Sequence, residues 1–153
     1  MNVLYLKVET IYFNMDKLDI YGVTEVKHFD RMGLNINLLK GIFSIGFENP
    51  SLIQQKAIAP LSEGRDIIAQ SQSGTGKTGA FSIGSLNRID CSLNQPQILA
   101  LAPTRELAKQ IYDVYSKLSK YMKIDIELCM GGMRNIYDET IKKQVIVGTP
   151  GRV

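Results

Sequence analysis

The sequence has very little histidine and cysteine, and this scarcity excludes two kinds of site. His28 is the only histidine among 153 residues, so it cannot build a metal centre by itself, and we expect it in a solvated loop. Cys91 and Cys129 are the only cysteines, and they lack the Cys-x-x-Cys spacing of zinc and redox sites. We therefore expect both to be reduced, core-type residues of an intracellular protein.

Long apolar runs are also missing. No stretch approaches the roughly 18 residues of a membrane span, and the start of the chain lacks the charged-then-apolar pattern of a signal peptide. Internal repeats, low-complexity tracts and long runs of one charge are absent as well. These absences predict no membrane partner and leave cytosol and nucleus open as compartments.

The composition is that of an ordinary globular domain with a core. Hydrophobic residues make up 44% of the chain and charged residues 22%. The net charge of +3 is compatible with a nucleic-acid partner without singling one out. The length predicts one folded domain, which we place at residues 28–153, with residues 1–27 as a poorly ordered N-terminal extension.

One stretch carries a strong chemical signal. A short apolar strand pattern at residues 66–69 leads into a loop rich in Gly and Ser, and a helix-compatible segment follows. The spacing Ser71-x-x-x-x-Gly76-Lys77-Thr78 is that of a phosphate-binding P-loop, with the small Ser71 in place of the first glycine. Backbone N–H groups and a helix N-terminus would then face a phosphate. The alternative is a flexible loop between a strand and a helix.

The residues of this loop have separate expected tasks. Gly74 and Gly76 can adopt positive φ and let the backbone approach an anion closely. Lys77 can reach the outer phosphates, and the Thr78 hydroxyl can ligate Mg²⁺. The predicted nucleotide contacts of the loop are Ser71, Gln72, Ser73, Gly74, Thr75, Gly76, Lys77 and Thr78.

Strand and helix patterns alternate along the chain. Strands are expected at 66–69, 98–102, 124–130 and 144–147, and helices at 38–45, 51–58, 77–88 and 133–143. Thr104 is the expected N-cap of a further long helix. Its predicted apolar face consists of Leu107, Ile111, Val114, Leu118 and Tyr121. The alternation predicts an α/β fold, a parallel sheet with helices on both faces.

The loops that follow the strands are expected to meet at one edge of that sheet. Besides the P-loop, these are residues 103–105, Gly131-Gly132 and residues 148–152, which carry Thr, Gly and Arg. Such residues suit a phosphate backbone, because they contact phosphates without reading bases. Ordinary turn chemistry is the alternative for each loop alone, but together they predict a polyanionic ligand beside the nucleotide. The turns bearing Lys77, Arg105 and Arg152 should then point the same way.

In their order along the chain, these segments resemble the motifs of the DEAD-box RNA helicases. Residues 46–54 are similar to the Q motif, with Phe29 at the place of its upstream aromatic, and residues 71–78 to motif I. Further similarities are residues 103–108 to motif Ia, Gly131-Gly132 to the GG motif and residues 149–152 to motif Ib. The stretch from Gly41 to Ser82 is similar to the branch that contains translation initiation factor 4A and the exon-junction helicase.

The resemblance implies an amino-terminal RecA-like P-loop domain that binds ATP and Mg²⁺, with Lys77 and Thr78 at the reacting phosphates. Phe47 would stack on adenine, and Phe29 would belong to the same pocket. Gln54 would hydrogen-bond the adenine edge, because its amide offers both a donor and an acceptor. Single-stranded or short duplex RNA would be bound largely without regard to sequence, and protein cofactors are possible. The implied RNA contacts are Pro103, Thr104, Arg105, Gly131, Gly132, Thr149, Pro150, Gly151 and Arg152.

The resemblance also implies what turnover would need. The family's Asp-Glu-Ala-Asp motif, on the strand after motif Ib, is not among these 153 residues, and Asp138-Glu139-Thr140 is no substitute because no apolar strand precedes it. We expect an ATP-dependent RNA helicase as the parent protein, and a chain that alone lacks turnover and exposes unpaired strand edges. The alternatives are a non-catalytic nucleotide- and RNA-binding module and another P-loop ATPase acting on DNA.

Overall fold

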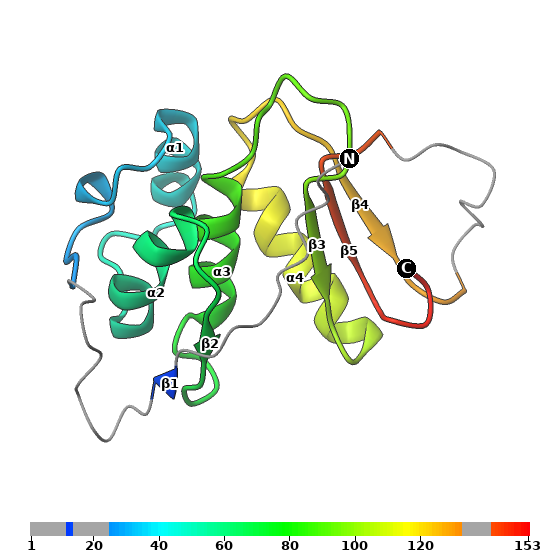
Figure 1. Ribbon diagram of the computed structural model, residues 1–153, viewed down its shortest axis with the longest axis horizontal. Helices are drawn as coiled ribbons and strands as arrows, with labels where there is room; N and C mark the ends of the chain where they lie inside the picture. The colour runs from blue at the N-terminus through cyan, green and yellow to red at the C-terminus, as the bar shows by residue number, and fades with distance from the viewer. Residues whose placement is uncertain (1–11, 14–24, 133–141) are drawn as a thin grey trace.

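The computed structural model describes residues 12–13, 25–132 and 142–153 (Figure 1). The strands are β1 (Tyr12–Phe13), β2 (Ile68–Ala69), β3 (Ile98–Leu101), β4 (Ile126–Cys129) and β5 (Val145–Gly148). The helices are the 3-10 turn η1 (Phe29–Arg31), α1 (Ile36–Ser44), α2 (Leu52–Ser62), α3 (Lys77–Leu86) and α4 (Arg105–Leu118). The predicted strands and helices are therefore present, except the helix at 133–143, most of which lies outside the described residues.

The strands pair in parallel but form two sheets instead of the one sheet that the sequence predicted. A three-stranded sheet has the order β3-β5-β4, with Ile98 and Ile126 both paired to Val145. The P-loop strand β2 is separate from it and pairs with β1, Tyr12 with Ile68. Two residues of the predicted N-terminal extension thus form a strand. Within the described ranges, no strand bridges β2 and β3.

Local chemistry sets the helix ends. The Asn35 side chain caps α1 by accepting a hydrogen bond from the Asn37 N–H at 2.8 Å. After the C-cap residue Ile45, Gly46 has a φ of +84°, as a helix C-terminal glycine should. Thr104 is the predicted N-cap of α4, and its Oγ1 accepts from the Leu107 N–H at 3.2 Å. The sequence predicted the ends at Gly46 and Thr104 but not the cap at Asn35, although all three depend on residues only a few positions away.

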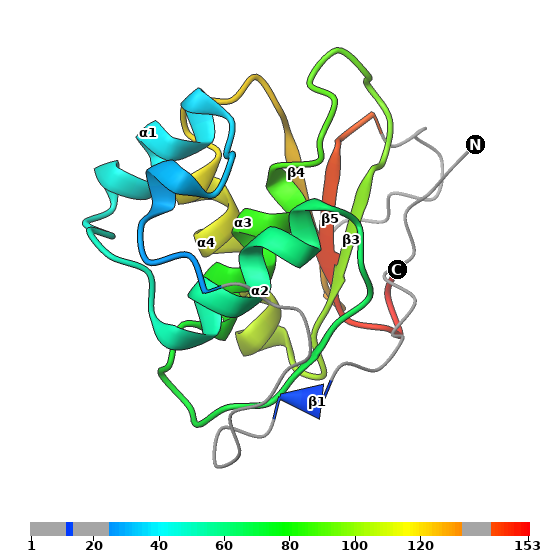
Figure 2. The same cartoon turned by 60° about the vertical axis from the view of Figure 1, so that its left-hand side comes forward.

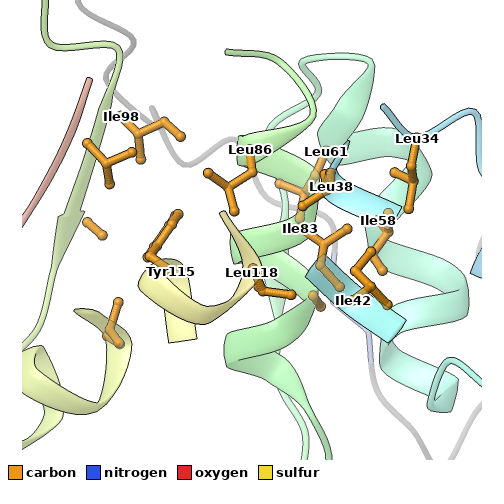
Figure 3. Close-up of a cluster of buried hydrophobic side chains, with 14 of the residues drawn as sticks. Leu34, Leu38, Ile42, Ile58, Leu61, Ile83, Leu86, Ile98, Tyr115 and Leu118 are labelled. Carbon is orange, nitrogen blue, oxygen red and sulfur yellow. The ribbon is translucent and has the colours of Figure 1, made fainter. Parts of the chain in front are cut away.

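The helices pack in layers against the three-stranded sheet (Figures 1 and 2). Within the described ranges, α4 is the helix that lies on this sheet, whereas the sequence predicted helices on both faces. The helix α3 packs on α4, and α2 packs on α3. The helix α1 also packs on α4, and a Cβ on Gly41 would lie only 1.9 Å from the Leu118 carbonyl oxygen. The core fills the space between these elements, as Figure 3 shows for Ile42, Ile83 and Leu118.

The buried face of α4 differs from the predicted one. Ala108, Ile111, Tyr115 and Leu118 are buried, whereas Leu107 is 37% exposed and Tyr121 lies beyond the helix and is 43% exposed. The helix is rotated so that the tyrosine at position 115, not the leucine at 107, faces the core. In Figure 3, Tyr115 lies between α3 and the strand that carries Ile98.

Candidate functional site at one edge of the sheets

The P-loop connects β2 to α3 and curls tightly over residues 70–76. Gly74 and Gly76 have φ values of +80° and +93°, which confirms that both use the left-handed conformation. Gly76 is also the N-cap of α3. A Cβ on it would lie 2.8 Å from Gln54 Nε2 and 3.0 Å from Ser51 Oγ, so glycine is required there for space as well as for backbone conformation.

The Lys77 side chain folds back over this loop. Its Nζ donates to the carbonyl oxygens of Ser71 and Gln72 at 2.5 and 2.6 Å. The hydroxyls of Ser71 and Thr75 are hydrogen-bonded to each other, and the Thr75 hydroxyl also donates to the Gln72 carbonyl. Neutral carbonyls therefore hold a full positive charge at the start of a helix, and a ligand with several anionic oxygens would be a stronger partner for it.

The start of α2 is hydrogen-bonded to the P-loop through Gln54, which is only 4% exposed. The Gln54 Oε1 accepts from the Ser51 N–H at 2.9 Å, and its Nε2 donates to the Gly76 carbonyl at 3.2 Å. The Ser51 hydroxyl donates to the Thr75 carbonyl at 2.8 Å. Ser51 was not among the predicted site residues, although the Ser-x-x-Gln spacing of a capping box could have indicated it.

The two aromatic residues of the predicted nucleotide pocket lie one behind the other. The rings of Phe29 and Phe47 are stacked, with centroids 6.4 Å apart and an interplanar angle of 15°. Phe47 is half-buried, but Phe29 is 1% exposed and also contacts the edge of Phe43. Phe29 therefore supports Phe47 from within the core, and of the pair only the ring of Phe47 can be reached by a ligand.

The loops after β3, β4 and β5 contact one another. Arg105 is exposed, and its guanidinium lies against the glycine pair: a Cβ on Gly131 would be 2.7 Å from it. The Thr149 N–H donates to the Cys129 carbonyl at 3.2 Å, which joins the last loop to the end of β4. Burial raises the pKa of the Cys129 thiol, Glu127 raises it further, and Arg152 lowers it. The loop that carries Arg152 therefore lies beside the end of β4, since the Arg152 N–H donates to the Thr149 carbonyl at 2.9 Å.

All four loops lie on the same side of the molecule. Figure 1 shows the P-loop before α3, the turn between β3 and α4, and the turns after β4 and β5 along its lower edge. The prediction that the turns of Lys77, Arg105 and Arg152 point the same way is therefore confirmed, although β2 lies outside the three-stranded sheet. Pro103, Thr104, Gly132, Pro150 and Gly151 are exposed on these loops, and Thr78 follows Lys77 at the start of α3.

Other kinds of site find less support in the described part of the chain. No group of three or more His, Cys, Asp or Glu side chains there could hold a metal ion. The described helices are all too short or too polar to cross a membrane. His28 is exposed, and Cys91 and Cys129 are free thiols, as expected.

Comparison with known proteins decides the family. Residues 51–153, more than half of the chain, match the model of the DEAD/DEAH box helicases. The chain belongs to the DEAD/DEAH box helicase family. This confirms the resemblance carried by the motifs from the Q motif to motif Ib, and it explains the P-loop and the parallel strands as parts of a RecA-like domain.

Members of the DEAD/DEAH box family with similar sequences include initiation factor 4A. The ATP-dependent RNA helicase eIF4A of Saccharomyces cerevisiae is 55% identical over 130 residues, which are 84% of this chain and 33% of the relative. Eukaryotic initiation factor 4A of Dictyostelium discoideum is 49% identical over 146 residues, covering 92% of this chain and 36% of the relative. The chain thus spans about a third of the length of these relatives.

Solved structures of the family share the fold. Saccharomyces cerevisiae Dbp5 bound to RNA and ADP BeF3 superposes with a TM-score of 0.78 at 45% identity, over 83% of this chain and 33% of that one. A DEAD box protein from Methanococcus jannaschii gives a TM-score of 0.77 at 34% identity, over 84% of this chain and 36% of that one.

Proposed function

We propose that this chain is the nucleotide-binding, amino-terminal part of an ATP-dependent RNA helicase. The observation that carries the proposal is the common edge along which the P-loop and the loops after β3, β4 and β5 lie, so that a phosphate loop stands beside three loops suited to a nucleic-acid backbone. The names of the similar relatives, and the RNA and ADP BeF3 bound to Dbp5, support it. The chain covers about a third of those proteins, so their activity is carried over as a proposal.

The nucleotide side would bind ATP through the P-loop and the start of α2. Lys77 would exchange the neutral carbonyls of Ser71 and Gln72 for phosphate oxygens, so that its positive charge would meet a negative one. Phe47, held from behind by Phe29, would stack on the base. The Gln54 amide would hydrogen-bond the adenine edge, and it already contacts the loop that holds the phosphates.

Magnesium fits this site as a companion of the phosphates. Since the described residues offer no cluster of acidic ligands, Mg²⁺ would keep its contacts to phosphate and water and add the Thr78 hydroxyl at the start of α3. When bound, the ion neutralises charge that develops on the transferring phosphoryl group. Lys77 and Thr78 are therefore the residues of this chain that we assign to the reacting phosphates.

The RNA side would consist of the loops after β3, β4 and β5. Arg105 and Arg152 would supply guanidinium groups and Thr104 and Thr149 hydroxyls, and the glycines Gly131, Gly132 and Gly151 place no side chain between the backbone and a phosphate. Contacts of these kinds position a strand without reading its bases. We infer that the substrate is single-stranded or short duplex RNA and that the activity is local unwinding of the duplex. The compartment would be cytosol or nucleus, and protein cofactors would be further partners.

The test uses the complete protein that contains this chain. RNA-stimulated ATP hydrolysis should fall at least about 100-fold in Lys77→Ala, the loss that follows when one main charge-stabilising group is removed. Lys40→Ala is the matched control, because Lys40 is an exposed lysine of α1 away from the loops. Hydrolysis that survives in Lys77→Ala would remove Lys77 from this role. Binding of ATP and RNA without any turnover in the wild type would favour the non-catalytic module.

A further inference from the structure

Two hydroxyl groups meet in the apolar interface between α3 and α4. The Tyr115 hydroxyl lies 2.8 Å from Ser85 Oγ, and the two side chains are 0% and 5% exposed. Tyr115 belongs to α4 and Ser85 to α3, thirty residues earlier in the chain. Around them the interface is apolar, with Leu86, Ile83 and Leu118 fully buried.

The protons of this pair can be assigned by counting donors. The Ser85 hydroxyl lies 2.7 Å from the Phe81 carbonyl and 3.1 Å from the Ser82 carbonyl, and its single hydrogen can serve that helical turn. The Tyr115 hydroxyl then donates to Ser85 Oγ. Burial raises the pKa of Tyr115 to about 12, so the phenol keeps this hydrogen throughout the neutral pH range.

The pair restricts how α3 can move against α4. Apolar side chains tolerate small shifts because their attraction has little directionality, whereas a hydrogen bond weakens steeply outside a narrow range of distance and angle. A shift of α3 along α4 would leave the Tyr115 hydroxyl buried without an acceptor, while the Ser85 hydroxyl would keep its bond to the Phe81 carbonyl within α3. The Phe81 ring, 6.3 Å from that of Tyr115, limits rotation on the same side.

Each of these helices begins at one half of the proposed site. The helix α3 starts at Lys77, eight residues before Ser85, and α4 starts at Arg105, ten residues before Tyr115. At about 1.5 Å per residue, the hydroxyl pair lies roughly 12 Å behind the first and 15 Å behind the second. The pair thus joins, through two rigid helices, the end that would hold phosphates to the end that would hold RNA.

We propose that Ser85 and Tyr115 are positioning residues that couple the nucleotide site to the RNA site. The inference rests on the proposed function. The hydrogen bond fixes α3 relative to α4, so that a displacement of the P-loop by nucleotide is passed to the loop of Arg105, and one caused by RNA is passed back. Coupling of this kind is reciprocal: each ligand changes the affinity for the other by the same factor.

The experiment measures the coupling factor, which is the ratio by which one ligand changes the affinity for the other, in the complete protein. The affinity for a fluorescent polyuridine strand is determined with and without ADP and beryllium fluoride, and the affinity for nucleotide with and without the strand. Tyr115→Phe keeps the ring and deletes only the hydroxyl. We expect the coupling factor to fall about fivefold to tenfold, as for the loss of one hydrogen bond, with the affinity for nucleotide alone unchanged. Tyr121→Phe, which deletes the hydroxyl of an exposed tyrosine, should leave the factor intact.

A second variant makes the test independent of any folding defect. Ser85→Ala removes the same hydrogen bond from the other helix, and the double variant should lose no more coupling than either single one. An unchanged factor in Ser85→Ala and Tyr115→Phe, even with a lower melting temperature, would make the pair merely structural and overturn the inference. A wild-type protein that binds neither ligand would instead overturn the proposed function, and the inference with it.

Discussion

At the scale of single residues, Gln54 has two partners that different parts of the chain supply. Its Oε1 completes the start of α2 by accepting from the Ser51 N–H, and its Nε2 reaches the Gly76 carbonyl of the P-loop. One side chain therefore connects the proposed base-binding and phosphate-binding segments. An amide is suited to this position because it donates and accepts at once.

Gln54→Ala should weaken ATP binding by about tenfold, the equivalent of one lost hydrogen bond to the ligand, and should lower the selectivity for ATP over GTP. Titration of the complete protein with both nucleotides measures this. Gln55→Ala is the control, because Gln55 is the next residue of α2 and its Nε2 contacts the Pro50 carbonyl, not the P-loop. Equal effects of the two substitutions would assign Gln54 to the stability of α2 alone.

At the scale of elements, the contact between α1 and α4 depends on the absence of a side chain at Gly41. A Cβ there would lie 1.9 Å from the Leu118 carbonyl oxygen and 2.8 Å from its carbonyl carbon. These are backbone atoms at the end of α4, so they cannot move aside as the tip of a side chain could. The close approach lets Leu38 and Ile42 of α1 enter the core.

We expect Gly41→Ala to destabilise the protein by about 1–3 kcal/mol or more, the usual cost of overpacking, although alanine favours helix formation. The free energy of unfolding from urea titration checks this. Gly151→Ala should have almost no effect on stability, since a Cβ at Gly151 meets no atom within 4 Å. Equal stability of the wild type and Gly41→Ala would show that α1 can move away from α4 without loss.

At the scale of the whole molecule, the division into two sheets leaves strand edges open. Within the described ranges, β3 pairs only with β5, and β2 pairs only with the two-residue strand β1. Parallel strands of this apolar kind are normally paired and covered, and open edges favour association with other chains.

The 153-residue chain, expressed alone, should therefore melt below about 45 °C and self-associate. It should also show no ATP turnover, because the Asp-Glu-Ala-Asp motif is not among its residues. Circular dichroism during heating and size-exclusion chromatography measure the first two properties, and a phosphate-release assay measures the third. The complete protein under the same conditions is the comparison. A monomer that melts cooperatively well above that temperature would contradict the expectation and show that the described pairing is sufficient.

The local structure of this protein, its loop conformations and helix ends, is largely determined by residues that are near one another in the sequence. The P-loop follows from the spacing of Gly74, Gly76 and Lys77, because positive φ and a helix start are local properties. The caps at Thr104 and Asn35 and the glycine at position 46 depend on neighbours only a few residues away. The order of parallel strands and helices then predicts that the loops meet at one edge.

The tertiary structure decided what depends on partners far along the chain. Phe29 proved to be buried behind Phe47, and Tyr115 faces α3 where sequence periodicity favoured Leu107. The separation of β2 from the three-stranded sheet could not be predicted either, since it depends on which strand edges find partners. The physical reason is that neither choice is local: an aromatic side chain suits core and surface alike until other elements pack against it, and a strand edge pairs with whichever strand the fold brings beside it.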